Sequence, residues 1–139
     1  MNRRIDTVMN KDISVKTSSR TDFVDITAEI RSVLEASGVR DGAVDVFVPH
    51  TTAGVTINEN ADPDVLRDME TILDRIVPWT GGYRHAEGNS AAHVKTSLMG
   101  SSLRIPVANG RLSLGTWQGV YLCEFDGPRS RRVRIQCAG

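Results

Sequence analysis

The chain has 139 residues, which fits one domain with a hydrophobic core of its own. Its 17 lysines and arginines balance 17 aspartates and glutamates, so the basic surface of a nucleic-acid-binding protein is not expected. No apolar run approaches the roughly 20 residues of a membrane span, and the N-terminal stretch MNRRIDTVMNKD lacks the apolar core of a secretion signal. We therefore expect a cytoplasmic protein without membrane or nucleic-acid partners, in which Cys123 and Cys137 are reduced thiols.

The first part of the chain predicts an arm, a strand and a helix. Residues 1–11 are polar and aperiodic, so we interpret them as a loose N-terminal arm before a single domain over 12–139. DISVKT (12–17) alternates apolar and polar residues, as a strand does. Asp22 has the side chain of a helix N-cap, and Gly38 is a typical C-terminal stop. Between them, apolar residues recur at helical spacing: Phe23, Ile26, Ile30, Val33 and Leu34.

The next part predicts two short strands and a second helix. AVDVFVP (43–49) and GVTIN (54–58) are rich in residues that favour strands. Asp62 is the expected N-cap of the helix, Pro63 suits its first position, and the helix ends before Pro78. The apolar stripe expected to face the core consists of Val65, Met69, Ile72, Leu73 and Ile76.

The second half predicts a long loop followed by strands. Residues 79–93, WTGGYRHAEGNSAAH, are Gly-rich and polar, and we expect them to enter a short helix near 90–93. Turns are expected at Gly100, Asn109-Gly110 and Asp126-Gly127-Pro128. The expected strands are HVKTSLM (93–99), SLRIPV (102–107), RLSLG (111–115), GVYLCEF (119–125) and RRVRIQC (131–137). About eight strands and two helices predict an α+β fold with a jelly-roll-like, antiparallel β-sandwich core and helices to one side.

The three histidines are the first candidates for chemistry. His50 lies at a predicted strand end, and His85 and His93 flank EGNSAA in the predicted loop. Carboxylates and amides lie near them in the sequence: Glu59, Asn60, Glu87 and Asn89. Three imidazoles with an open fourth position are a typical catalytic zinc site. Histidines oriented by carboxylates can instead move protons near neutral pH. The residues alone leave both alternatives open.

Further donors lie beside these histidines and in the segment LGTWQG (114–119). In that segment Thr116 and Gln118, between two glycines, form either a tight β-turn or one wall of a pocket. Hydroxyl and basic side chains that could hold an anion such as phosphate are Thr51, Thr52, Ser90, Arg84 and Lys95.

The last predicted strand is basic. Its alternation places Arg132 and Arg134 on one face, opposite Val133 and Ile135. We interpret this face as a solvated sheet edge that resists aggregation, with phosphate or subunit contacts as the alternative.

Three long stretches carry a family resemblance. PHTTAGVTINENADPDVLRDM (49–69), YRHAEGNSAAHVKTSLMGSSLRIPV (83–107) and LSLGTWQGVYLCEFDGPRSRRV (112–133) closely resemble the YjbQ-like family, whose members are often described as secondary thiamine-phosphate synthases. The resemblance implies an α+β fold with a β-sandwich core, a homotrimer and a pocket that gathers the histidines, where a divalent metal (zinc or magnesium) is expected. The implied pocket residues are His50, Thr51, Thr52, Glu59, Asn60, His85, Glu87, Asn89, His93, Thr116 and Gln118.

Two functional hypotheses follow. The first is an enzyme acting on a small phosphorylated metabolite, such as a transferase that joins a pyrimidine methyl diphosphate to a thiazole phosphate. Its catalytic residues would be His50, Glu59, His85, Glu87 and His93, with His50, His85 and His93 as the alternative metal ligands, and Arg84 and Lys95 would hold phosphate. The second is a non-catalytic trimeric module that binds a metal or metabolite. Because the polar motifs exceed what one small pocket needs, we also expect sites completed across subunits.

Overall fold

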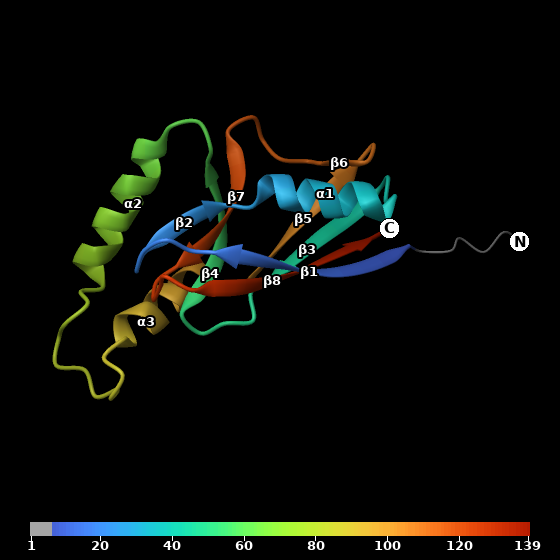
Figure 1. Ribbon diagram of the computed structural model, residues 1–139. Helices are drawn as coiled ribbons and strands as arrows, with labels where there is room; N and C mark the ends of the chain where they lie inside the picture. Colours follow the sequence, from blue (N-terminus) through green and yellow to red (C-terminus); the bar gives the residue numbers. More distant parts are fainter. Residues whose placement is uncertain (1–6) are drawn as a thin grey trace, which may run out of the picture.

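The computed structural model describes residues 7–139 as two antiparallel sheets and three helices (Figure 1). The elements are β1 (Val8–Lys16), β2 (Asp22–Asp25), α1 (Thr27–Ser37), β3 (Gly42–Phe47), β4 (Ala53–Glu59), α2 (Pro63–Ile76), α3 (Ser90–Met99), β5 (Ser102–Ala108), β6 (Arg111–Leu112), β7 (Gln118–Glu124) and β8 (Ser130–Ala138). The expected α+β class with a sandwich-like arrangement of eight strands is confirmed. No helix in this described range is long and apolar enough to cross a bilayer.

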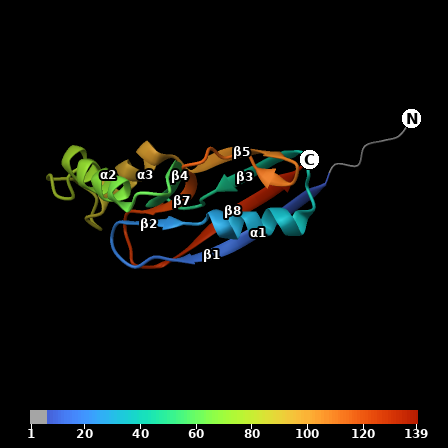
Figure 2. The same ribbon diagram turned by 90° about the horizontal axis from the view of Figure 1, so that it is seen from above.

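The two sheets and three helices pack in layers through their apolar faces. The larger sheet has the order β1-β8-β3-β5-β6, and the smaller has the order β2-β7-β4. Helix α1 and the smaller sheet cover the same face of the larger sheet, and their side chains form one core with it. Helices α2 and α3 pack on the other face of the smaller sheet, around Leu73, Ala92 and Phe125 (Figures 1 and 2). Strand β7 is therefore buried on both faces along nearly its whole length.

Local sequence signals set several element boundaries as expected. The Asp62 side chain accepts a hydrogen bond from the Asp64 amide (2.9 Å), and Pro63 opens α2. Helix α1 ends at Gly38, which has a left-handed φ of 72°. Asn109 and Gly110 have φ values of 53° and 74°, and they join β5 to β6 in a two-residue hairpin.

The beginnings of β1 and α1 differ from the expectation. Strand β1 starts at Val8, so residues 8–11 of the expected arm pair with β8. Asp22 does not cap α1, because Asp22–Asp25 forms β2 beside β7. The spacing of Phe23 fits a helix as well as a strand, but its ring packs edge-on against Phe125 at 6.3 Å. Tertiary packing thus decides a boundary that local periodicity leaves ambiguous.

The prediction of a strand at HVKTSLM (93–99) is wrong, because this stretch lies in α3. Its alanines, lysine, leucine and methionine favour helix, and Ala92 and Met99 pack against the smaller sheet. Strand β4 accommodates the helix end because a Cβ at Gly54 would lie 2.6 Å from the carbonyl oxygen of Gly100. Val94 and Leu98 contribute to an apolar alternation typical of a strand, but both side chains are exposed on α3 and do not face the core.

Two further expectations about faces and edges are corrected. Of the predicted core stripe of α2, only Leu73 is buried, whereas Ile72 and Ile76 are 53% and 64% exposed. The basic strand β8 is not a sheet edge, since it lies between β1 and β3. Its alternation is as predicted, with Arg132 exposed beside the buried Val133.

Candidate functional site

His50 lies in the turn between β3 and β4, where the backbone of β8 holds its ring. The Arg132 amide donates a hydrogen bond to Nε2 of His50 (3.0 Å). Because Nε2 accepts this bond, a neutral His50 carries its proton on Nδ1. Burial, and then the nearby positive charge of Arg131, lower the pKa of His50 below its ordinary value of 6.5. His50 is therefore neutral at pH 7, and its N–H group makes no hydrogen bond to residues 7–139.

His50 and His93 share a cleft between this turn and α3. The cleft has a volume of about 450 Å³ and is lined by His50, Thr51, His93, Thr96, Ser97, Gly100 and Ser101. Its lining is rich in hydroxyl groups, and Oγ1 of Thr96 is buried without a hydrogen-bond partner in the described chain. An adjoining hollow of about 460 Å³ also includes His50, together with Arg129 and Arg131. The cleft thus offers hydrogen-bond donors beside two arginines, each of which is paired with a carboxylate.

His85 does not line the cleft, but its ring contacts that of His93, which does. The two rings pack edge to face with their centroids 5.5 Å apart, and Nε2 of His85 lies 4.0 Å from a carboxylate oxygen of Glu87. The structure therefore places His85 near both Glu87 and His93. His50 and His93 line the same cleft from two different segments, the turn before β4 and helix α3.

A buried ion pair lies beneath the His50 turn. Nε of Arg131 donates to both carboxylate oxygens of Glu124 (2.9 and 3.1 Å), and both side chains are almost fully buried. Thr17 donates to Glu124 (2.8 Å), and Arg131 donates to Oγ1 of Thr52 (2.8 Å). Burial acts to raise the pKa of Glu124, but the hydrogen bonds from Arg131 and Thr17 outweigh it, so the pKa lies below its ordinary value.

Sequence reasoning missed the role of this pair. The alternation of β8 does contain the signal, because Arg131 has the same parity as the buried Val133 and Ile135. A charged residue in a buried register needs a partner. Glu124, in the apolar run of β7, is that partner.

Two predicted phosphate-binding residues have other surroundings. Lys95 is buried and forms an ion pair with Asp74 on α2, outside the histidine cleft. Arg84 is exposed in the loop and makes no ion pair with any residue in 7–139. Asn89 precedes α3, and its Nδ2 donates to Asp126 (2.8 Å), while its buried Oδ1 has no partner in the same range.

The remaining predicted residues lie at the far end of β4. The Asn60 side chain donates to the Gln118 carbonyl (3.2 Å), and Oε1 of Gln118 accepts from the Gly115 amide (2.8 Å), which is the tight-turn interpretation of LGTWQG. Thr116 is exposed in that turn. Because β4 rises about 3.3 Å per residue, Glu59 and Gln118 lie about 20 Å from the start of the strand. The chain by itself does not bring them to the histidines.

The expected three-histidine metal site is not assembled by the described part of one chain. Residues 7–139 contain no group of three or more His, Cys, Asp or Glu side chains placed to hold a metal ion. His50 in its neutral form also presents a protonated Nδ1 and an occupied Nε2, so neither nitrogen offers a lone pair. A metal site remains a prediction, with His85 and His93 as its nearest pair.

The buried pair generates the first prediction. Replacing Arg131 by Ala leaves the Glu124 carboxylate without its main partner, so we expect the free energy of unfolding to fall by about 3–5 kcal/mol. The exposed Arg132 gives the matched control, because Arg132→Ala should change the free energy of unfolding by less than about 1 kcal/mol. Urea unfolding at equal protein concentration measures both. Equal losses in the two variants would contradict the assignment.

The second prediction concerns pH. The folded-state pKa of His50 lies below 6.5, so between these two pKa values the unfolded chain binds a proton that the folded chain does not. The contribution of His50 to the free energy of unfolding is complete above about pH 6.5 and decreases as the pH falls towards the folded-state pKa. His50→Gln should lack this decrease in urea unfolding between pH 8 and 5. An NMR titration midpoint for His50 at or above 6.5 would contradict it.

Known proteins resemble this chain along nearly its whole length. The family described as "UPF0047 protein YjbQ-like" matches residues 11–139. The UPF0047 protein YugU of Bacillus subtilis is 52% identical over 132 residues, covering 94% of this chain and 100% of the relative. A crystal structure of a YjbQ/UPF0047 family protein from Clostridium acetobutylicum matches with 57% identity and a TM-score of 0.89, covering 90% of this chain and 97% of that one. A YbjQ-like protein of unknown function from Sulfolobus solfataricus matches with 31% identity and a TM-score of 0.93, covering 97% and 99%. The chain therefore belongs to the UPF0047 (YjbQ-like) family.

Proposed function

We propose that the cleft between His50 and His93 binds a small phosphorylated metabolite and transfers protons to or from it. The observation that carries the proposal is the hydrogen bond from the Arg132 amide to Nε2 of His50, which leaves Nδ1 of the neutral ring as its N–H donor in a residue that lines the cleft. Hydroxyl groups of Thr51, Thr96 and Ser101 line the same cleft. Such donors suit phosphate oxygens, and Arg129 lines the adjoining hollow.

The reaction that the family resemblance implies is a transfer to a thiazole phosphate with release of pyrophosphate. Phosphate groups on both substrates would need the donors of the cleft. In that transfer the pyrimidine methyl carbon loses its bond to the diphosphate oxygen and gains one to the thiazole nitrogen. His93 is only partly exposed and contacts His85, so we propose that it gives a proton to the departing pyrophosphate. We therefore propose thiamine-phosphate synthase-like transferase activity in the cytoplasm, where the buried free thiols Cys123 and Cys137 would stay reduced.

An assay of purified protein with both substrates tests the enzyme hypothesis. We expect His93→Ala and His50→Ala to lower turnover by about 10²–10⁴-fold, as the loss of a general acid or base does. Lys11→Ala, an exposed change on β1, is the control and should retain turnover. Full activity in both histidine variants would contradict the proposal. Tight binding of thiazole phosphate without product would instead favour the non-catalytic module.

We further propose that the protein acts as a homotrimer with sites shared between subunits. Apolar side chains on the outward faces of α2 and α3 have no partner in the described chain: Ile72, Ile76, Val94 and Leu98 are 48–64% exposed. The predicted site residues also divide between two ends of β4. In a ring of head-to-tail contacts, one end of each subunit meets the opposite end of its neighbour. Such a ring would place Glu59 of one subunit beside the histidine cleft of the next.

Mixing two inactive variants tests the shared site. His93→Ala and Glu59→Gln each damage a different half of the proposed site, so a mixed trimer contains some sites with both halves intact. We expect activity to recover after co-refolding, and the mass to be trimeric by light scattering. Ile72→Glu with Ile76→Glu should lower that mass, because it buries charge in the apolar contact. A monomeric wild type, or a mixture without recovery, would contradict sharing.

A further inference from the structure

A second hollow lies away from the histidine cleft. It has a volume of about 660 Å³, and its walls come from α1, the segment after it and the β5–β6 hairpin. Arg40 of this hollow precedes β3, whereas His50 follows it. With a rise of about 3.3 Å per residue, the length of β3 between the two sites is about 17 Å.

Three arginines surround this hollow without a carboxylate partner. Arg31, Arg40 and Arg111 line it, and none lies within ion-pair distance of an acidic group in residues 7–139. Glu35 is also on the rim but pairs with none of them. Some other arginines of the chain do pair, as Arg104 does with Asp45 at 2.9 Å. Three like charges around one hollow leave a positive potential that a bound anion would neutralise.

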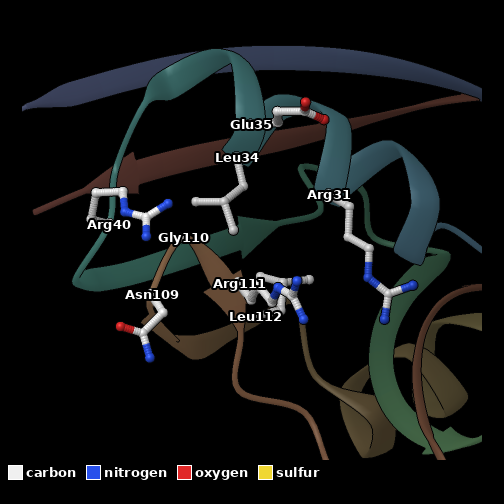
Figure 3. A pocket seen from close by; sticks show the side chains of 8 residues that line it. All are labelled: Arg31, Leu34, Glu35, Arg40, Asn109, Gly110, Arg111 and Leu112. Atoms are coloured by element: carbon white, nitrogen blue, oxygen red, sulfur yellow. The ribbon is translucent and has the colours of Figure 1, made fainter.

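The backbone holds these arginines on different elements. The carbonyl oxygen of Arg40 accepts a hydrogen bond from the Gly110 amide (2.8 Å), which joins the segment after α1 to the hairpin tip. A Cβ at Gly110 would lie 2.8 Å from a guanidinium nitrogen of Arg40, so the glycine lets that side chain lie against the tip. Arg111 begins β6 immediately after this turn. Figure 3 shows Arg31 and Arg40 on opposite sides of Arg111.

Between the arginines the hollow has an apolar floor. Leu34 is buried, and the half-buried Leu112 packs against the same core (Figure 3). Guanidinium groups on several walls of a hollow with an apolar floor fit a ligand that has a diphosphate-like group and a less polar body. Nucleic acid fits less well, because the formal net charge of the chain is zero and Glu35 lies on the rim.

We propose that this arginine hollow is a second ligand site, which binds a small molecule carrying a diphosphate group. The site is independent of the proposed function of the histidine cleft. Arg31, Arg40 and Arg111 hold the phosphate oxygens, and Leu34 and Leu112 contact the less polar part.

Inorganic pyrophosphate and ADP are the probes, with backbone amide NMR shifts of the full chain as the readout. We expect both probes to shift the amides of residues 109–112, and ADP to bind more tightly because its nucleoside contacts the floor. Arg31→Gln with Arg111→Gln should weaken this binding by about tenfold or more. Lysine at the same two positions should restore part of the binding, since lysine keeps the positive charge but lacks the forked donors of a guanidinium group.

Two controls separate this site from general charge and from the histidine cleft. Arg75→Gln with Arg104→Gln also removes two positive charges, but outside the hollow, and should leave the amide shifts of residues 109–112 unchanged. His50→Ala with His93→Ala should remove only shifts near Thr51 and Ser101. Unchanged binding after loss of Arg31 and Arg111, equal weakening in the charge control, or no shift at residues 109–112 would each overturn the proposal. Larger shifts there with single-stranded RNA than with pyrophosphate would overturn it in favour of nucleic acid.

Discussion

The buried ion pair between Glu124 and Arg131 is the interaction on which the rest of the site depends. Glu124 lies on the smaller sheet and Arg131 on the larger one, so the pair ties the two sheets together across the core. Burying two charges is costly, and the cost is offset only where geometry and additional hydrogen bonds are good. Thr17 and Thr52 supply those bonds from two different segments. The pair therefore aligns four parts of the chain at one end of the sandwich.

The geometry of the histidine cleft follows from this alignment. The amide that holds His50 belongs to Arg132, the residue directly after Arg131, so the register of β8 also orients the imidazole. The neighbouring positive charge disfavours a second proton on that ring. On the other side, the Asp126 amide donates to Glu124 (3.1 Å), and the Asp126 side chain accepts from Asn89, which precedes the helix of His93. Both histidines of the cleft are thus positioned by the same polar network.

The strands also act as rigid spacers between polar surfaces. β4 keeps the Glu59 end away from the histidine cleft, and β3 keeps the arginine hollow away from it. A rigid spacer inside one subunit means that unlike ends can meet only between subunits. The exposed apolar side chains of α2 and α3 are the surface that we propose for such contacts. A separate arginine hollow would add a second ligand without interfering with the chemistry of the first.

Much of the secondary structure was predictable because its signals are local. Asp62 with Pro63, Gly38 and Asn109-Gly110 each act through their own backbone, and the structure has the predicted helix start, helix end and hairpin at these positions. The sandwich-like α+β class follows from the strand count, and the contact of His85 with His93 follows from their closeness in the sequence, eight residues apart across the start of α3. Local periodicity failed at residues 93–99, where helix and strand patterns overlap and packing against β4 selects the helix.

By itself, the sequence determined the family, the turns and the residue types available for chemistry. Only the tertiary structure decided which of them meet. It paired Lys95 with Asp74, joined Glu124 to Arg131, and separated Glu59 from His50 by the length of a strand. Local propensities act over a few neighbouring residues, whereas these contacts join residues that only the packing of two sheets brings together.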